Sequence, residues 1–285
     1  MKVSSLLQHC LVASGLVLAA GAASATTVYS TDSFTNASGS NMGAAVAGAN
    51  GWYFNNVRAG GTAAVSTAHA QSGDGSVSMS GPNNAKADIE YLPNAVAIGG
   101  NYNSTASLGL LSTLSSMSYD WYRDSSSTAN ADQHASLRVL IDTDGNLATT
   151  SDRGGLVFES VYNTPSQAVD QWVSEMVTDA TKLWNFGTLL GSGANINATP
   201  YAYDASLAEW KAFFPNAVII GFSSGIGSGW NSFSGAVDNI AWTIGGVTTS
   251  TNFETAAAGE VPEPASLALL ALAMAGVAAA RRRRH

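Results

Sequence analysis

The sequence holds a single cysteine, Cys10, which lies in an apolar stretch near its start. No cysteine occurs between residues 26 and 259, so neither a disulfide framework nor thiol chemistry is available to that segment. A domain without disulfides depends on its apolar core or on a bound metal ion. Seven tryptophans, nine tyrosines and nine phenylalanines give the chain enough large side chains for such a core.

Charged residues are also scarce, at 11% of the chain, and basic ones most of all. Segment 26–259 contains seven lysines and arginines against eighteen aspartates and glutamates, a net charge near −11. Nucleic-acid binding depends on lysine and arginine side chains at phosphates, so we expect no nucleic-acid partner. An acidic surface suits an extracellular protein and the binding of divalent cations.

Residues for catalysis are few. The pattern His-Glu-x-x-His is absent, and segment 26–259 holds only two histidines, His69 and His134. A glycosidase would need two carboxylates that face a cleft. Asp88 and Glu90 share one strand face, where carboxylates are more often simply solvated, and Glu159 is a third candidate. We therefore predict no catalytic residues and no enzyme, with a polysaccharide hydrolase as the least favoured alternative.

The first residues have the three parts of a secretory signal peptide. Lys2 supplies a positive charge, the stretch from Cys10 to Ala20 is apolar, and Ala23-Ser24-Ala25 is a small-x-small cleavage site. The apolar stretch is too short to span a bilayer, which needs about 20 residues. We predict export with cleavage before Thr26, and an uncleaved anchor is the alternative.

The other end of the chain combines a short motif, an uncharged stretch and a basic cluster. Val261-Pro262-Glu263-Pro264 precedes sixteen uncharged residues, 265–280, and then Arg281, Arg282, Arg283 and Arg284. As a helix, the uncharged stretch would cover about 24 Å of a bilayer core about 30 Å thick. The arginines would remain on the cytoplasmic side. We predict a short transmembrane helix that follows an extended Pro-Glu-Pro segment.

This order of motif, Ala/Leu-rich stretch and arginine cluster resembles the PEP-CTERM sorting domain, with the family's motif at Pro262, Glu263 and Pro264. The resemblance implies that the protein is a substrate of exosortase, a membrane cysteine transpeptidase of bacteria that make exopolysaccharide. It also implies a location at the cell envelope, on the cell surface or in the extracellular matrix. Release or renewed anchoring after cleavage are both open.

Between the two signals, short apolar runs alternate with stretches rich in Gly, Ser, Thr and Asn, which is typical of strands joined by turns. Strands are predicted at residues 76–79, 87–91, 116–122, 137–141, 155–161, 217–222 and 236–244. Ser206-Leu-Ala-Glu209 is a capping box that predicts a short helix before Pro215. Residues 167–184 fit a helix or a strand, and we favour a strand.

The predicted fold class is mainly β: an antiparallel β-sandwich over residues 26–248 with one short helix, followed by a linker over 249–260. Residues 137–159 and 229–240 resemble secreted jelly-roll and concanavalin-like sandwich domains, including the final strand Val237-Asp238-Asn239-Ile240. The Glu-x-Asp-x-x-Glu signature of concanavalin-like glucanases is absent.

Asp142-Thr143-Asp144-Gly145-Asn146 places alternate oxygen-bearing side chains around a turn glycine. Calcium takes six to eight hard oxygen ligands, so Asp142, Asp144 and Asn146 form a candidate calcium site with Asp152 as a late ligand. The alternative is a plain β-turn, because Asp-Gly and Gly-Asn form turns without metal.

The jelly-roll resemblance implies a second candidate calcium site. In related domains an acidic residue on the first strand and one on the last can share a structural calcium, and the matching residues here are Asp32 and Asp238. The alternative for Asp238 is a hydrogen-bonded carboxylate at a strand end.

Aromatic side chains could offer flat platforms for sugar rings at residues 52–54, at 121–122 and at Trp230. Aromatic residues of a β protein are usually in the core. Trp230, in a loop-like stretch between glycine and asparagine, is the candidate that we expect to be exposed. The sequence therefore predicts a sorted surface or matrix protein with a non-enzymatic role in exopolysaccharide. A calcium-dependent carbohydrate-binding module is the alternative.

Overall fold

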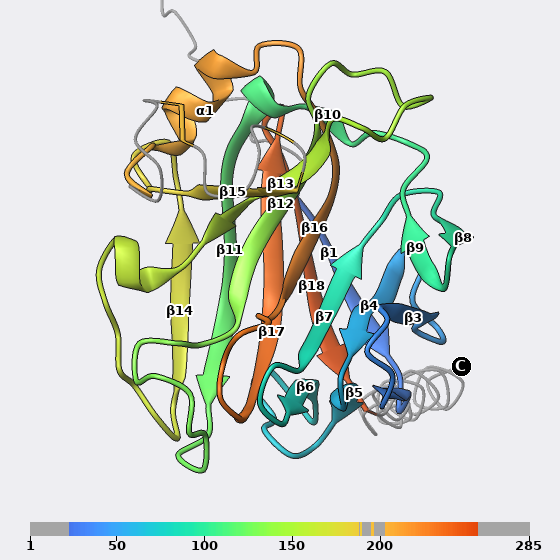
Figure 1. Cartoon of the computed structure of the whole chain (residues 1–285), viewed down its shortest axis with the longest axis vertical. Helices are drawn as coiled ribbons and strands as arrows, with labels where there is room; N and C mark the ends of the chain where they lie inside the picture. Colours follow the sequence, from blue (N-terminus) through green and yellow to red (C-terminus); the bar gives the residue numbers. More distant parts are fainter. Residues whose placement is uncertain (1–22, 188, 190–194, 197–202, 256–285) are drawn as a thin grey trace, which may run out of the picture.

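The computed structural model describes residues 23–187, 189, 195–196 and 203–255. They form two eight-stranded sheets, which we call sheet A and sheet B, packed face to face (Figure 1). The predicted β-sandwich is therefore confirmed.

Sheet A holds both ends of the described chain. Its strands are β1 (Ala23–Tyr29), β2 (Ser33–Asn36), β5 (Gly61–Ser66), β6 (Ser76–Gly81), β11 (Leu114–Arg123), β14 (Trp172–Val177), β17 (Phe233–Ile244) and β18 (Val247–Glu254). Strands β1 and β18 pair in parallel. The long strand β17 pairs antiparallel with β6, β11 and β18.

Sheet B has the order β15-β13-β12-β16-β7-β4-β3, with β10 beside β16. These strands are β3 (Met42–Ala45), β4 (Trp52–Arg58), β7 (Lys86–Tyr91), β10 (Gly109–Leu110), β12 (Ser136–Asp142), β13 (Arg153–Phe158), β15 (Trp184–Gly187) and β16 (Val218–Ile226). Two short strands, β8 (Val96–Ile98) and β9 (Asn101–Asn103), pair with each other. Two single 3-10 turns occur at Leu111–Thr113 and Ser160–Tyr162.

The seven runs predicted as strands lie in β6, β7, β11, β12, β13, β16 and β17. The ambiguous run 167–184 forms β14 and the first residue of β15, so the choice of strand was right. The run 155–161 is shorter than predicted, because a 3-10 turn replaces the strand at Ser160.

The predicted helix is α1 (Leu207–Phe213), and it begins at the predicted capping box. The Ser206 side chain accepts a hydrogen bond from the backbone N–H of Glu209, and the Glu209 carboxylate accepts one from the backbone N–H of Ser206 at 2.8 Å. The helix is fixed to the sandwich by Trp210, which is fully buried and donates its indole N–H to the carbonyl of Leu183 at 2.9 Å. The cap and this one buried ring hold a helix that is too short to be stable alone.

One predicted boundary needs correction. Residues 249–254, predicted as linker, form most of β18, where Thr251 and Phe253 are buried. Their Thr/Ser-rich sequence resembles a linker, but their backbone pairs with β1 over the whole run and with β17 up to Thr251. At the other end β1 begins at Ala23, three residues before Thr26, and the signal cleavage before Thr26 stays a prediction.

The core lies between the sheets and is rich in aromatic rings. Phe222 of sheet B stacks on Trp242 of sheet A with ring centroids 4.4 Å apart, and Trp52 of sheet B meets Phe253 of sheet A at 5.0 Å. Residues of both sheets alternate between this core and the outer faces, as strand geometry requires. The core therefore fixes which side chains of sheet B face outward.

The apolar stretch of the predicted signal peptide, the transmembrane helix and the sorting motif lie outside the described residues. Within the described part, no helix is long and apolar enough to cross a membrane.

Candidate functional site: a groove on the outer face of sheet B

The outer face of sheet B carries an unusual mixture of aromatic and charged side chains. In the strand register one row crosses six strands: Trp184, Val157, Arg138, Ser223, Glu90 and Tyr53. These residues come from β15, β13, β12, β16, β7 and β4. Side chains separated by more than 100 positions in the sequence thus share one surface.

Three neighbouring cavities follow this face, with volumes of about 320, 270 and 260 Å³. The first and second share Glu159, Trp184 and Trp230 as lining residues, and the second and third share Phe186. We call the three cavities together the groove. Its length suits an extended ligand rather than a small compact one.

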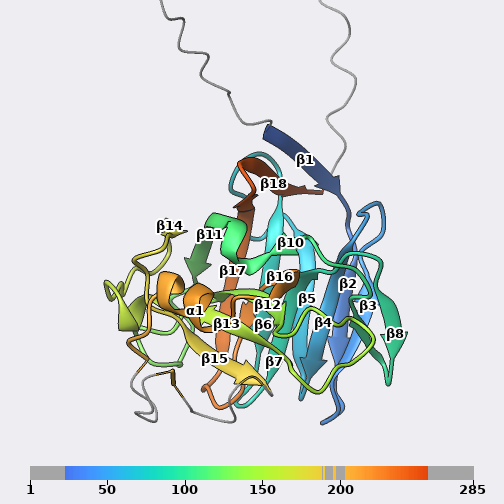
Figure 2. The same cartoon turned by 90° about the horizontal axis from the view of Figure 1, so that it is seen from above.

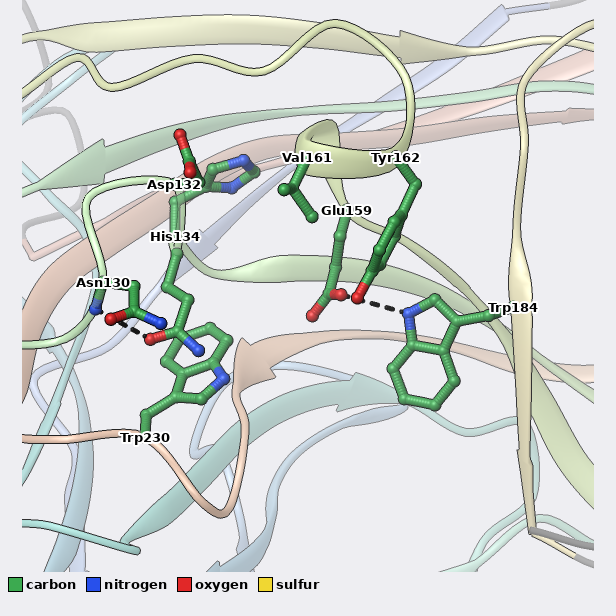
Figure 3. Close-up of a pocket in the computed structure, with 9 residues that line it drawn as sticks. Asn130, Asp132, His134, Glu159, Val161, Tyr162, Trp184 and Trp230 are labelled. Atoms are coloured by element: carbon green, nitrogen blue, oxygen red, sulfur yellow. Dashed lines mark hydrogen bonds between the residues drawn. The ribbon is translucent and has the colours of Figure 1, made fainter. Parts of the chain in front are cut away.

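The first cavity has aromatic walls and polar groups between them (Figure 3). Trp184 and Trp230 lie on opposite sides, and Glu159 lies between them. The Trp184 indole N–H donates to Glu159 Oε2 at 3.1 Å, which fixes both side chains. Tyr162 stands beside Glu159, and Asn130 lies near Trp230. Both tryptophans are half-buried, so each leaves part of its ring to the groove.

An ion-pair network lies under the middle of the groove. The Arg138 guanidinium is 2.8 Å from Asp88, and Lys86 is 3.2 Å from the other oxygen of the same carboxylate. Asp88 and Arg138 are 1% and 6% exposed. Although burial opposes the charge of Arg138, the Asp88 carboxylate raises the pKa of that guanidinium. The network gives the groove a rigid charged floor.

The two glutamates of the groove, Glu90 and Glu159, differ in the hydrogen bonds that their carboxylates accept. Both oxygens of Glu90 accept hydrogen bonds, from the side chains of Asn55 at 2.6 Å and Asn56 at 2.8 Å. Burial raises the pKa of Glu90, and the negative charge of Asp88 raises it further. Burial also raises the pKa of Glu159, against the effect of the Trp184 hydrogen bond. The expectation that Asp88 and Glu90 are solvated was wrong, because both are buried and held by neighbouring side chains: Asp88 by Arg138 and Lys86, and Glu90 by the two asparagines.

His134 lines the first cavity but is held as part of the core. Its ring stacks on Trp121 at a centroid distance of 3.9 Å, and it is 3% exposed. Nδ1 lies 3.0 Å from the Ala135 carbonyl, which can only accept, so Nε2 accepts from the Ser160 hydroxyl at 2.6 Å. Burial lowers the pKa of His134 to about 4, so the ring is neutral at pH 7.

A Gly-x-Ser-x-Gly pattern does occur at residues 221–225, centred on Ser223. In hydrolases that pattern forms a strand-to-helix turn that exposes the serine. Here Ser223 lies inside β16, is 1% exposed, and accepts a hydrogen bond from Arg138 at 3.1 Å. Ser223 is therefore a buried, hydrogen-bonded residue beneath the groove and does not form a nucleophile elbow.

The first candidate calcium residues do come together. Oxygens of Asp142, Asp144 and Asp152 lie within 4.8 Å of one another at the turn between β12 and β13. Asn146, the fourth candidate, accepts a hydrogen bond from the backbone N–H of Ala148 at 3.3 Å. The local sequence pattern thus corresponds to a local cluster of carboxylates.

The second pair of candidates shows separate contacts. Asp32 accepts from the backbone N–H of Ala47 at 2.7 Å, and Asp238 accepts from that of Phe253 at 2.9 Å. Among the described residues, the group of three carboxylates at the β12–β13 turn includes neither of them. Burial raises the pKa of Asp238 to about 6.

Comparison with known proteins identifies the C-terminal motif. The model of the PEP-CTERM protein-sorting motif matches residues 260–284, which contain the predicted Pro262, Glu263 and Pro264. The protein is therefore an exported one that is sorted to the cell envelope. No curated protein matches this sequence.

Solved structures show a loose likeness of fold. A family 11 carbohydrate-binding module from Clostridium thermocellum, in complex with a β-1,3-1,4-mixed-linked tetrasaccharide, is 12% identical with a TM-score of 0.36 and covers 72% of this chain and 96% of its own. The family 11 module of the cellulosomal cellulase Lic26A-Cel5E, also of C. thermocellum, is 13% identical with a TM-score of 0.35 and coverages of 77% and 90%. A loop-swap mutant of Xyn11A from Necallimastix patriciarum is 12% identical with a TM-score of 0.32 and coverages of 75% and 100%.

The sequence indicated Trp230 but missed most of the groove. The structure places Trp230 in its wall, while residues 52 and 121 are core tryptophans. Trp184 and Phe186 alternate along β15, so a pattern of aromatic, other, aromatic could have placed both rings on one face. Arg138 gave no such signal, because its partner Asp88 is fifty positions away.

Proposed function

We propose that this exported protein binds a polysaccharide chain in the groove and does not cleave it. The observation that carries the proposal is the pair Trp184 and Trp230, which face each other across a cavity that also holds Glu159. Sugar rings have apolar faces and polar edges, so they suit aromatic walls combined with fixed hydrogen-bonding groups. Sorting to the cell envelope would bring the protein to the exopolysaccharide that surrounds such cells.

The charge of the groove favours a neutral polymer. Glu159 and Asp132 line the first cavity and Glu90 the third. The lining cations are each paired with a buried aspartate, Lys86 and Arg138 with Asp88, and Arg153 with Asp142. Segment 26–259 also carries a net charge near −11. A polyanionic polysaccharide would be repelled by this field, whereas hydroxyl groups can donate to the carboxylates.

Binding without hydrolysis is supported by the state of the carboxylates. Asp88 is held by two cations, and both oxygens of Glu90 accept hydrogen bonds. Glycoside hydrolysis needs two carboxyl groups that reach the bond being broken. Glu159 and Asp132 both line the first cavity, and each already accepts a hydrogen bond, Glu159 from Trp184 at 3.1 Å and Asp132 from Gln167 at 2.9 Å.

The test is a binding titration of the purified full chain with neutral exopolysaccharide, together with an assay for new reducing ends. We expect binding without new reducing ends. Trp184→Ala and Trp230→Ala should each weaken polysaccharide binding tenfold or more, a loss of about 1.4 kcal/mol of binding free energy. Trp172→Ala is the matched control, because Trp172 lies on β14 of sheet A. Equal binding by all four proteins would refute the groove, and release of reducing ends would refute the non-enzymatic role.

A further inference from the structure

The turn between β12 and β13 gathers negative charge that its own cation does not balance. Asp142, Asp144 and Asp152 each offer an oxygen within 4.8 Å of the others. Arg153 is the cation in direct contact, with Nε 3.0 Å from Asp142 Oδ2. Three carboxylates and one guanidinium leave two negative charges, and repulsion between them destabilises the turn.

One oxygen of Asp142 is buried without a partner in the described part of the chain, a feature separate from the clustering of the three carboxylates. Its side chain is 0% exposed, yet Oδ1 has no hydrogen-bond partner among the residues that the structure describes. Its other oxygen, Oδ2, is the one bound by Arg153. A buried carboxylate oxygen without a partner costs free energy, so native proteins usually satisfy such an atom with a proton donor, water or a metal ion.

Hydrogen bonds within the β12–β13 loop hold the carboxylates in place. The Asp152 carboxylate accepts from the Thr143 hydroxyl at 2.9 Å and from the backbone N–H of Asp144 at 3.1 Å. Asp144 accepts from the backbone N–H of Asn146 at 2.7 Å, across Gly145, whose φ is +74°. The left-handed glycine and these bonds hold the carboxylates close together in spite of their repulsion.

We propose that Asp142, Asp144 and Asp152 bind one calcium ion at the β12–β13 turn. Calcium takes hard oxygen ligands, and a carboxylate can give one or both of its oxygens, with water for the rest of the shell. The ion would supply the partner that Asp142 Oδ1 lacks and neutralise the two excess charges. Oδ2 of Asp142 would keep its bond to Arg153.

The site also lies next to the groove, through Arg153. This guanidinium donates to the Ser104 carbonyl and to the Leu147 carbonyl, each at 3.0 Å, and it lines the third cavity. Calcium would therefore fix the turn that holds one end of the groove. The calcium site does not depend on the proposed polysaccharide binding, and either could fail without the other.

The experiment is a thermal melt of the purified full chain, first in chelator and then in about 10 mM calcium chloride, a concentration that saturates sites typical of extracellular modules. A site that is about 99% occupied should raise the melting temperature by roughly 5–10 °C. The same concentration of magnesium should raise it less, because magnesium demands a tighter octahedral shell.

Two variants locate the ion. Asp144→Asn changes an exposed side chain, so the fold should persist while the calcium-induced shift falls by at least half. Asp179→Asn is the matched control. Asp179 is a surface carboxylate in the loop between β14 and β15, where it pairs with Lys211 of α1. This variant should keep the full shift. No shift in the unmodified chain, or an equal shift in Asp144→Asn, would overturn the assignment.

Discussion

Replacement of His134 by glutamine should change how the stability of the protein depends on pH. The ring is 3% exposed, stacked on Trp121 and bonded as a neutral acceptor to Ser160. Its folded pKa of about 4 lies below the ordinary value of 6.5, mainly because of burial. The folded state therefore takes up the proton only near pH 4, whereas the unfolded chain takes it up near pH 6.5.

The direction and size of the pH effect on stability follow from this difference between the folded and unfolded pKa values. Above pH 6.5 the histidine is neutral in both states, and its full contribution to stability is present. As the pH falls from 6.5 to 4, the unfolded state binds a proton that the folded state does not, so stability is lost. The change from 6.5 to about 4 corresponds to about 3 kcal/mol. Glutamine does not titrate, so this loss should be absent from His134→Gln.

Urea unfolding at pH 7 and at steps down to pH 4 measures the effect. At pH 7 the variant should be less stable, because it lacks the stacked ring. The difference in free energy of unfolding between the two proteins should then shift by about 3 kcal/mol in favour of the variant by pH 4. Ser160→Ala is the control, because it removes the Nε2 partner but keeps the buried ring. A constant difference between unmodified protein and His134→Gln over this range would refute the reasoning.

Two further predictions concern the ion-pair network and the helix. Arg138→Met should lower the free energy of unfolding by about 3–5 kcal/mol in urea, because it leaves the buried Asp88 with Lys86 alone. The double variant with Asp88→Asn should recover part of this loss, and an additive double variant would contradict the pairing. Ser206→Ala should cost about 1 kcal/mol in the same assay, because the capping box of α1 is lost. A loss below 0.3 kcal/mol would show that the packing of Trp210 holds the helix without its cap.

Local patterns predicted the strands well because alternation depends on a few neighbouring residues. The capping box at Ser206 and the carboxylates around Gly145 were found for the same reason, since their partners are close in sequence. Residues 249–254 were missed as strand because their run of Thr, Ser and Asn has little apolar alternation. Their pairing is fixed by β1 and β17, which the local sequence does not reveal.

The groove could not be predicted in the same way, because it is assembled from distant segments. Glu159 follows β13, Trp184 lies on β15, and Trp230 belongs to the loop between β16 and β17. An alternating strand such as β7 suggests a solvated outer face for Asp88 and Glu90. Burial of that face depends on residues that are distant in the sequence, such as Arg138, which lies fifty positions after its partner Asp88. Sequence patterns thus predicted that a side chain faces outward, but not what covers it.

The two parts of the proposed role are compatible in space. The chain leaves the described sandwich after β18, which pairs with β1 in sheet A. The groove belongs to the outer face of the other sheet, around β12, β13 and β15, and Figure 2 places β1 and β18 away from these strands. A protein sorted through residues 260–284 would therefore be attached from the sheet A side. Its groove would remain open to a polymer while the tail is engaged at the envelope, so sorting and binding need not compete for one surface.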